Sequence, residues 1–154
     1  MTSNTNNENN NWCAVNDPET PSGQLEEIAG QATNNLPLLR RLAEHPNLSP
    51  TALYALSEHE DHQVRAALAE NPSSPRSLLE KLCRDSHADV RYFLAESYTL
   101  DLDLISSLLE DENPYVVHRA KNTLRKREVH LVATLPWTGA TAETQPKQRQ
   151  RKSG

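Results

Sequence analysis

The sequence is poor in the residues that build cofactor loops and aromatic pockets. Its 154 residues include only 4 glycines, 1 methionine, 1 phenylalanine and 2 tryptophans. None of the glycines falls in a GxGxxG or GxxxxGK[ST] pattern, so a nucleotide-cradling loop is not expected. Hydrophobic residues make up 36% of the chain; even with glycine added, this stays below the roughly 45–50% typical of globular chains. These absences exclude several common enzyme classes and predict that part of the chain is not folded.

Cysteine is also scarce, since Cys13 and Cys83 are the two in the chain and lie seventy positions apart. A disulfide framework or a structural zinc site needs more thiols at closer spacing. We therefore expect a reduced, cytoplasmic protein. No apolar run reaches the roughly 18–20 residues of a membrane span, and the polar, asparagine-rich N-terminus predicts no secretory signal.

The charge is unevenly distributed along the chain, although the net value is only −5. Residues 1–31 carry a net charge of −5, residues 32–117 carry −7 and residues 118–154 carry +7. An acidic body with a basic tail indicates either that the tail seeks an anionic partner or that it is merely solvated.

Three segments follow from composition. Residues 1–22 begin with six asparagines in the first eleven positions and hold too little apolar surface to offset their ordering entropy, so they are predicted to be disordered. Residues 23–127 form the predicted folded domain. Residues 128–154 are a C-terminal extension, with a short apolar motif over 129–137 followed by a basic, disordered tail.

The middle segment repeats itself with a period of 26 residues. The triplet Leu-Ala-Glu begins at Leu42, Leu68 and Leu94. Several other positions keep this step: Val64, Val90 and Val116; Leu56, Leu82 and Leu108; Leu53, Leu79 and Ile105; Pro46 and Pro72; Arg65 and Arg91; Asp85 and Asp111. Periods of about 20–50 residues are typical of stacked repeats. The predicted fold is all-α: an α-solenoid of about four units, each with two short helices, between disordered termini.

Apolar residues at helical spacing place the two helices of each unit. The first helices fall near 52–56, 78–82 and 104–108, and the second near 64–68, 90–94 and 116–124. The second-helix stripe at 90–94 includes Phe93. Serine caps are expected at Ser49 and Ser74, each followed by proline, and an aspartate cap at Asp101 or Asp103.

The order Asn-Pro, Ser-Pro, Leu-Leu, acidic turn, Val-Arg and Leu-Ala-Glu resembles the leucine-rich repeat variant family and the broader HEAT-like repeats. The closest unit is 71–96, NPSSPRSLLEKLCRDSHADVRYFLAE, and the resemblance covers about residues 36–124. It implies short helices stacked into a curved α-solenoid. The last unit departs from the pattern, with Val117 in place of arginine and Ser97-Tyr98 in place of Asn-Pro. Some members of this family carry an appended iron–sulphur cysteine cluster, which two distant cysteines cannot supply.

Two chemical sites are considered and set aside. His59 and His62 lie three residues apart among acidic neighbours, but a solvated turn explains them better than a metal site does. The other four histidines considered share no ligand spacing: His45, His87, His118 and His130. Cys83 with His87 could form a nucleophilic pair, but a half-buried structural thiol is favoured. We expect no catalytic residue, no metal and no cofactor.

Binding residues are predicted on the second helices. Arg65 and Arg91 could face a partner across the concave surface. The resemblance to HEAT-like repeats implies instead that such an arginine pairs between repeats with an acid six residues earlier, as Asp85 precedes Arg91. Tyr92 and His118 occupy the next register position and are predicted to form an exposed binding row, because aromatic residues anchor interfaces. Possible phosphate contacts are Lys121, Arg125, Lys126 and Arg127.

The predicted function is non-catalytic protein binding, by an adaptor or regulatory scaffold that presents a curved helical-repeat surface. A second hypothesis is nucleic-acid binding through the basic C-terminal helix and tail. A third is an accessory subunit of a lyase-type enzyme, as the HEAT-like resemblance implies. The sequence does not identify the protein partner.

Overall fold

The computed structural model describes residues 3–32 and 34–134. Within these ranges the secondary structure is entirely helical, with nine α-helices, one short 3₁₀ helix and no strand. The elements in chain order are α1 (Ser3–Asn16), α2 (Ser22–Gln31), α3 (Leu36–Ala43), α4 (Pro50–Leu56), α5 (His62–Ala67), α6 (Arg76–Leu82), α7 (Ala88–Glu96), α8 (Leu102–Ser107), η1 (Leu108–Glu110) and α9 (Pro114–Thr134).

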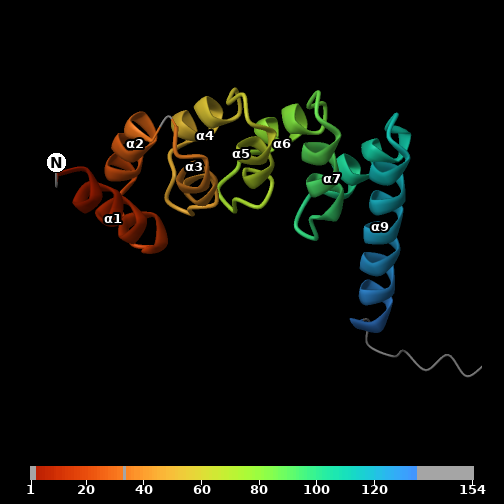
Figure 1. Cartoon of the computed structure of the whole chain (residues 1–154). Coiled ribbons are helices and arrows are strands. Elements are labelled where there is room, and N and C mark those ends of the chain that lie inside the picture. The colour runs from red at the N-terminus through yellow and green to blue at the C-terminus, as the bar shows by residue number, and fades with distance from the viewer. Residues whose placement is uncertain (1–2, 33, 135–154) are drawn as a thin grey trace, which may run out of the picture.

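The helices lie side by side in a row that follows the chain (Figure 1). Helices α3, α5, α7 and α9 form one series, and each contacts the next. Helices α4 and α6 lie along the upper edge of the same row in Figure 1. The last helix, α9, is the longest and extends beyond the row at its far end.

Side-chain caps explain where several of these short helices begin. Ser49 Oγ accepts a hydrogen bond from the Ala52 amide at 3.2 Å, as predicted for α4. The predicted cap at Ser74 was wrong: Pro75 holds the cap position of α6, and Ser74 Oγ instead donates to the Leu68 carbonyl at 2.7 Å. Asp101 precedes α8 but makes no side-chain cap, because its carboxylate accepts from Arg76.

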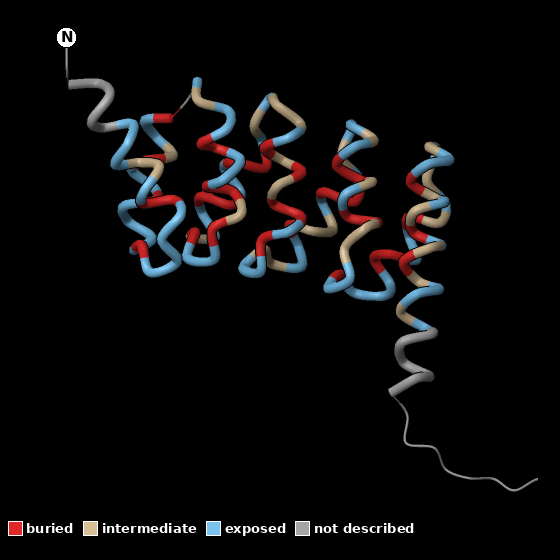
Figure 2. The backbone as a smooth tube through the Cα atoms, turned by 60° about the horizontal axis from the view of Figure 1, so that its bottom comes forward, coloured by how far each residue is buried: buried red, intermediate tan, exposed pale blue. Residues whose placement is uncertain are grey.

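The core is made of the positions that recur every 26 residues. Leu42, Leu68 and Leu94 have no exposed surface, and the rows of Val64 and Leu56 are buried in every unit. Buried residues line the facing sides of successive helices along the row (Figure 2). Phe93 differs from the prediction, since it keeps 41% of its surface exposed on the outer side of α7.

Over residues 3–22 the structure corrects the expectation of disorder for residues 1–22. Helix α1 covers Ser3–Asn16, and its C-terminal end buries Val15 to 1% exposure against the neighbouring helices. Asn47 Nδ2 donates to the Pro18 carbonyl at 2.7 Å, and His45 Nε2 lies 2.8 Å from the Asp17 carbonyl oxygen. The composition of this segment is polar, so docking on the next unit supplies the order that its own apolar content does not.

The predicted domain boundary after residue 127 falls inside a helix, because α9 continues to Thr134. The apolar motif over 129–137 therefore begins within α9, whereas the basic tail after residue 134 lies outside the described residues. No helix in the described part of the chain is both long enough and apolar enough to cross a membrane.

A substitution at Leu82 tests the packing of the row directly, because this side chain is fully buried. We expect Leu82→Ala to lower the free energy of unfolding by about 2–5 kcal/mol, the range for a core leucine. Leu102→Ala is the matched control, since Leu102 is 54% exposed. Urea denaturation measures both variants, and a loss below about 0.5 kcal/mol for Leu82→Ala, the size of an ordinary surface effect, would contradict the packing described here.

Candidate functional site

Arg65 and Arg91 each connect their own repeat to the following one. Arg65 Nε and Nη2 donate to the two carboxylate oxygens of Asp85 at 2.7 and 2.8 Å. Arg91 makes the same bidentate contact with Asp111, at 2.7 and 3.0 Å. The four side chains are 5–12% exposed. We call these contacts the Arg–Asp pairs; planar, two-point pairing of this kind fixes orientation as well as distance.

Each arginine also binds the backbone of the turn before its own helix. Arg65 Nη1 donates to the His59 carbonyl at 2.8 Å, and Arg91 Nη1 donates to the Asp85 carbonyl at 2.7 Å. Asp85, six residues before Arg91, thus accepts a hydrogen bond from Arg91 through its backbone oxygen, while its carboxylate binds Arg65. The resemblance to HEAT-like repeats implied an inter-repeat pair but gave the wrong carboxylate, because the carboxylate that binds Arg91 is that of Asp111, twenty residues later.

This geometry corrects the prediction that Arg65 and Arg91 face a binding partner. Their guanidinium donors are directed at groups of the chain itself, and Arg91 is only 7% exposed. In the structure both arginines are parts of the repeat framework, because burying a guanidinium charge is costly unless carboxylates and carbonyls accept its hydrogen bonds.

The Arg–Asp pairs shift the pKa of both partners. Burial works to raise the pKa of Asp111, but the hydrogen bond from Arg91, the Asn113 amide and the Arg91 charge outweigh it and hold this pKa below its ordinary value of 3.8. For Asp85, too, burial opposes the hydrogen bonds from Arg65 and the His87 amide, and the net pKa is lowered. The hydrogen bonds to Asp85 and Asp111 in turn raise the pKa of Arg65 and Arg91.

The pairs stop where the arginine is missing. An arginine one step before Arg65 would stand at position 39, which is leucine, and the acid it would need at position 59 is His59. His59 still makes the turn hydrogen bond that Asp85 makes in the next repeat. Its Nδ1 accepts a hydrogen bond from the Asp61 amide at 3.0 Å, just as Asp85 accepts one from the His87 amide. The arginine and the aspartate are thus both absent at this end of the row, so no buried carboxylate lacks an arginine there.

Tyr92 and His118 do not form one exposed row. Tyr92 is half-buried on α7, with the Arg119 guanidinium 5.6 Å from its ring centroid. His118 is exposed on α9, where its Nε2 lies 2.8 Å from Asn122 Nδ2. The exposed aromatic side chain on α7 is Phe93, which sequence reasoning assigned to the core.

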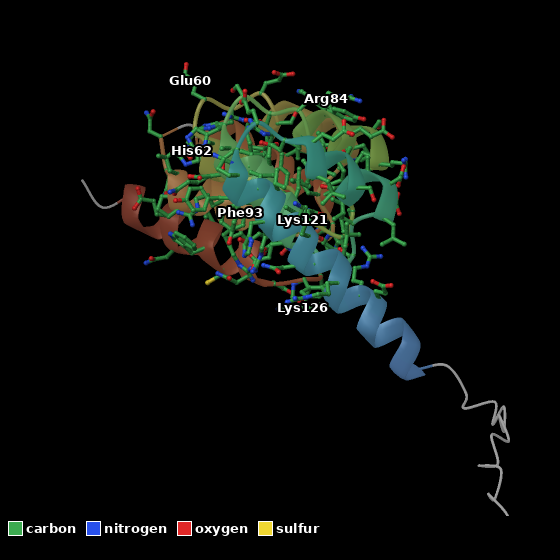
Figure 3. All side chains as sticks on the ribbon, turned by 90° about the vertical axis from the view of Figure 1, so that its right-hand side faces the viewer. Glu60, His62, Arg84, Phe93, Lys121 and Lys126 are labelled. Atoms are coloured by element: carbon green, nitrogen blue, oxygen red, sulfur yellow. The ribbon has the colours of Figure 1, made fainter. Side chains whose placement is uncertain are left out.

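The basic residues of α9 divide into two kinds. Lys121, Arg125 and Lys126 are exposed, and none has a hydrogen-bond or ion-pair partner among the described residues. Arg127 differs, because its Nη1 donates to the Leu100 carbonyl at 2.5 Å and it is half-buried. Figure 3 shows Glu60 near the top of the view and Lys126 well below it, on α9.

A broad groove of about 1120 Å³ lies beside α4, where α2, α3 and the turn before α5 meet. Its apolar floor comes from Ala29 of α2, Leu36 and Leu39 of α3, and Ala52 and Leu56 of α4. Its acidic rim is formed by Glu26, Glu60 and Asp61, and none of the described residues that line it is a lysine or an arginine. We call this feature the acidic groove. Sequence reasoning missed it because its walls come from four separate segments.

Two of the rim acids also have structural tasks. Asp61 caps α5, since its Oδ1 accepts from the Gln63 and Val64 amides at 2.7 and 3.4 Å. Glu26 accepts a hydrogen bond from the Ser49 hydroxyl. Glu60 is exposed, and its carboxylate has no partner among the described residues, so it is the rim acid available to a ligand.

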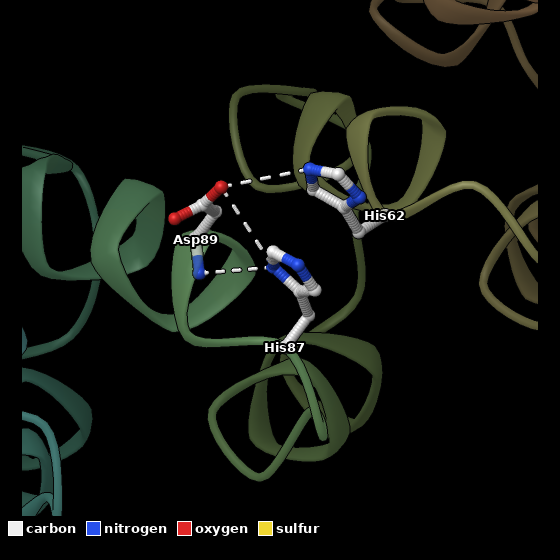
Figure 4. A group of neighbouring side chains, drawn as sticks. All are labelled: His62, His87 and Asp89. Atoms are coloured by element: carbon white, nitrogen blue, oxygen red, sulfur yellow. Dashed lines mark hydrogen bonds and ion pairs between the residues drawn. The ribbon is translucent and has the colours of Figure 1, made fainter.

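A cluster of possible metal ligands joins two repeats. His62 at the start of α5 meets His87 and Asp89 at the start of α7 (Figure 4). The two imidazole rings stack with centroids 3.7 Å apart and planes inclined by 13°. Asp89 Oδ2 lies 3.5 Å from His62 Nε2 and 3.8 Å from His87 Nδ1. The sequence prediction of no metal site weighed His62 with His59 and missed this grouping, because His62 and His87 are 25 positions apart.

The thiol of Cys83 is buried, and burial raises its pKa to about 11. Its proposed partner in a nucleophilic pair, His87, stacks on His62 and accepts the Asp89 amide instead. A nucleophilic cysteine needs a lowered pKa and access to solvent, and Cys83 has neither.

Comparison with protein families assigns a repeat type to the middle of the row. Residues 62–87 match the family model described as Leucine rich repeat variant, a HEAT-like helical repeat family. This confirms the resemblance over α5, α6 and the turn that leads to α7, a span as long as the predicted period. The matched repeat holds Arg65 and Asp85, which form one Arg–Asp pair. No curated protein and no solved structure shows a significant match to the chain.

The Arg–Asp pairs predict how stability depends on pH. A carboxylate whose folded-state pKa is lowered contributes stability that is present above its unfolded pKa, and this contribution is lost as the pH falls through the folded-state value. We therefore expect the free energy of unfolding to decline between about pH 5 and pH 3. The Asp85→Asn/Asp111→Asn variant should start lower at pH 7 and decline less, as measured by urea denaturation over this range; equal declines would contradict the pairing.

The two cysteines should differ in reactivity, because Cys13 is exposed and Cys83 is buried. At pH 8 a thiol with a pKa of about 11 is ionised in roughly one molecule in a thousand, and the thiolate is the reacting form. We expect iodoacetamide to modify Cys13 at least about 100-fold faster than Cys83. Peptide mass spectrometry follows both sites, with urea-unfolded protein as the control in which the rates converge. Equal rates in the native protein would show that Cys83 is accessible.

Proposed function

We propose that this protein is an α-solenoid that binds other proteins without catalysis, as an adaptor or regulatory scaffold. The acidic groove carries the proposal, because it combines apolar lining side chains with an acidic rim on a helical framework. Ligand pockets for small molecules are usually about 300–1,000 Å³ and enclosed. A broader, open groove fits an extended or helical peptide segment better.

The chemistry of the groove specifies the kind of segment it would accept. Apolar side chains would pack against Leu36 and Ala55, which are exposed, and lysine or arginine side chains would pair with Glu60 at the rim. Charge complementarity of this kind orients a partner and speeds its association. The acidic character of residues 32–117, with a net charge of −7, acts in the same direction over a longer range.

A non-catalytic role is supported by how the reactive side chains are used. Cys83 is a buried thiol, and the carboxylates of Asp85 and Asp111 are neutralised by Arg65 and Arg91. General acid–base catalysis needs a titratable group poised near the working pH and open to substrate. Cys83 and these two carboxylates are used for structure instead.

Nucleic-acid binding is the second candidate function, and α9 supplies the observation that favours it. Lys121 and Arg125 are four residues apart and so share one face of the helix, with Lys126 beside them. Unpaired cations on one face of a helix can neutralise phosphates. Protein binding remains the first candidate because the acidic groove offers apolar area as well as charge.

Two peptides of opposite charge test the first candidate. One twelve-residue peptide combines leucine with lysine and arginine, and its partner has glutamate at each basic position. We expect the basic peptide to bind the full chain and to shift the amide NMR signals of Ala55, Leu56 and Glu60. Glu60→Lys should weaken binding about tenfold, which corresponds to about 1.4 kcal/mol.

Glu110→Lys is the matched control, because it makes the same charge change at an exposed acid outside the groove. It should leave the affinity for the basic peptide within about twofold of the wild-type value, since salt screens a surface charge that lies far from the bound peptide. Equal affinity for both peptides, or signal shifts confined to α9, would rule out the groove as the binding site.

The second candidate predicts a different pattern with a 20-base-pair DNA duplex of mixed sequence. Its binding should weaken steeply between 50 and 200 mM salt, because counterion release drives it. The triple change Lys121→Glu/Arg125→Glu/Lys126→Glu, or removal of residues 138–154, should abolish DNA binding and leave the basic peptide bound at the groove. Fluorescence anisotropy measures both ligands. DNA binding unchanged by both variants would exclude α9 and the tail as its site.

A further inference from the structure

The cluster of His62, His87 and Asp89 is held together by the stacking of two repeats rather than by proximity in sequence. His62 belongs to the first turn of α5, and His87 is the residue that caps α7. Their ligand atoms and Asp89 Oδ2 all lie within 4.8 Å of one another. The regular stacking thus brings two imidazoles and one carboxylate to a single point on the surface (Figure 4).

The distances in the cluster fit a bound ion better than a shared proton. A hydrogen bond between an imidazolium and a carboxylate is about 2.7–2.9 Å long, whereas the two separations here are 3.5 and 3.8 Å. Two ligands placed about 2.0–2.1 Å from a tetrahedral zinc ion are about 3.4 Å apart. The cluster is therefore close to the spacing of a metal site and too wide for direct hydrogen bonds.

One nitrogen of the cluster already acts as an acceptor. The Asp89 amide donates to His87 Nδ1 at 3.3 Å, so this nitrogen presents a lone pair rather than a proton. A lone pair is what a metal ion requires of an imidazole ligand.

Acidic side chains outnumber basic ones around the cluster. His62 and Asp89 line a small hollow of about 150 Å³ together with Arg40, Glu44 and Glu70. Arg40 Nη1 donates to Gln63 at 2.7 Å, and Glu44 accepts from Arg41 at 2.9 Å. Glu70 is exposed and adds negative charge beside the site.

We propose that His62, His87 and Asp89 form a binding site for a borderline divalent transition metal, of which zinc is the representative. His62 Nε2, His87 Nδ1 and one oxygen of Asp89 supply three ligands, and water supplies the fourth, which is the donor set and count of an open zinc site. The site goes beyond the proposed protein-binding role and does not depend on it. Because it spans α5 and α7, a bound ion ties two consecutive repeats together.

Metal binding requires a local rearrangement at each of the two histidines. Lone pairs of stacked rings lie in nearly parallel planes and cannot both point at one ion, so the His62 ring turns out of the stack when the metal binds. His87 Nδ1 exchanges its long hydrogen bond with the Asp89 amide for a metal bond. Both changes alter the imidazole environment, which gives a spectroscopic signature of binding.

The test uses the full chain, freed of affinity tags and treated with chelator, titrated with zinc chloride by isothermal calorimetry. We expect one equivalent of zinc to bind, the thermal midpoint to rise with zinc concentration, and the imidazole ¹⁵N signals of His62 and His87 to shift. His62→Ala and Asp89→Asn should each weaken binding at least about tenfold, because each removes a ligand without removing the cap of α7.

His118→Ala is the control, since His118 is an exposed histidine on a different helix and should leave zinc affinity unchanged. Three results would overturn the proposal: no binding up to 1 mM zinc, binding that survives both His62→Ala and Asp89→Asn, or binding that shifts the imidazole signals of other histidines instead. Circular dichroism of each variant without metal checks that it is folded, so that lost binding reports the ligand and not the fold.

Discussion

Helices of six to nine residues are too short to be stable alone, and the whole structure depends on how this constraint is met. Isolated helices shorter than about 12–15 residues are marginal in water. In the stretch from α3 to α8 each helix is stabilised by its neighbours, through leucine and valine rows that recur every 26 residues. Burial alone is not directional, however, and would allow one layer to slide on the next.

The Arg–Asp pairs supply the directional contacts that apolar burial lacks. Arg65 holds the turn before its own helix through the His59 carbonyl and reaches the next repeat through Asp85. Arg91 repeats both contacts one step later. A bidentate contact at this depth has one geometry, so it fixes the register of consecutive layers. The Arg65–Asp85 pair joins the same two layers that bring His62 to His87, so the histidine cluster is a consequence of this stacking.

Periodicity predicted much of the fold because it records which side chains share a layer. The rows of Leu42, Val64 and Leu56 were identified from their spacing, and all are buried. The errors arose where an outcome depends on a neighbour rather than on the local pattern. Phe93 has helical spacing but faces outward, and α1 is ordered by docking although its composition is polar.

The candidate sites were harder to predict than the fold for the same reason. Arg65 and Arg91 have the residue type of binding anchors, and only their partners twenty residues later show that they are structural. The acidic groove and the histidine cluster each combine side chains from separate repeats. Spacing along the chain cannot show such groupings until the angle between layers is known.

The coupling between Arg91 and Asp111 tests the central claim most directly. A double-mutant cycle with Arg91→Ala, Asp111→Ala and the double variant, measured by urea denaturation at pH 7, gives this coupling without the other effects of each change. If the Arg–Asp pairs tie the repeats together, the coupling energy should be at least about 1 kcal/mol. A value near zero, with additive losses, would mean that apolar burial alone holds the repeats in register.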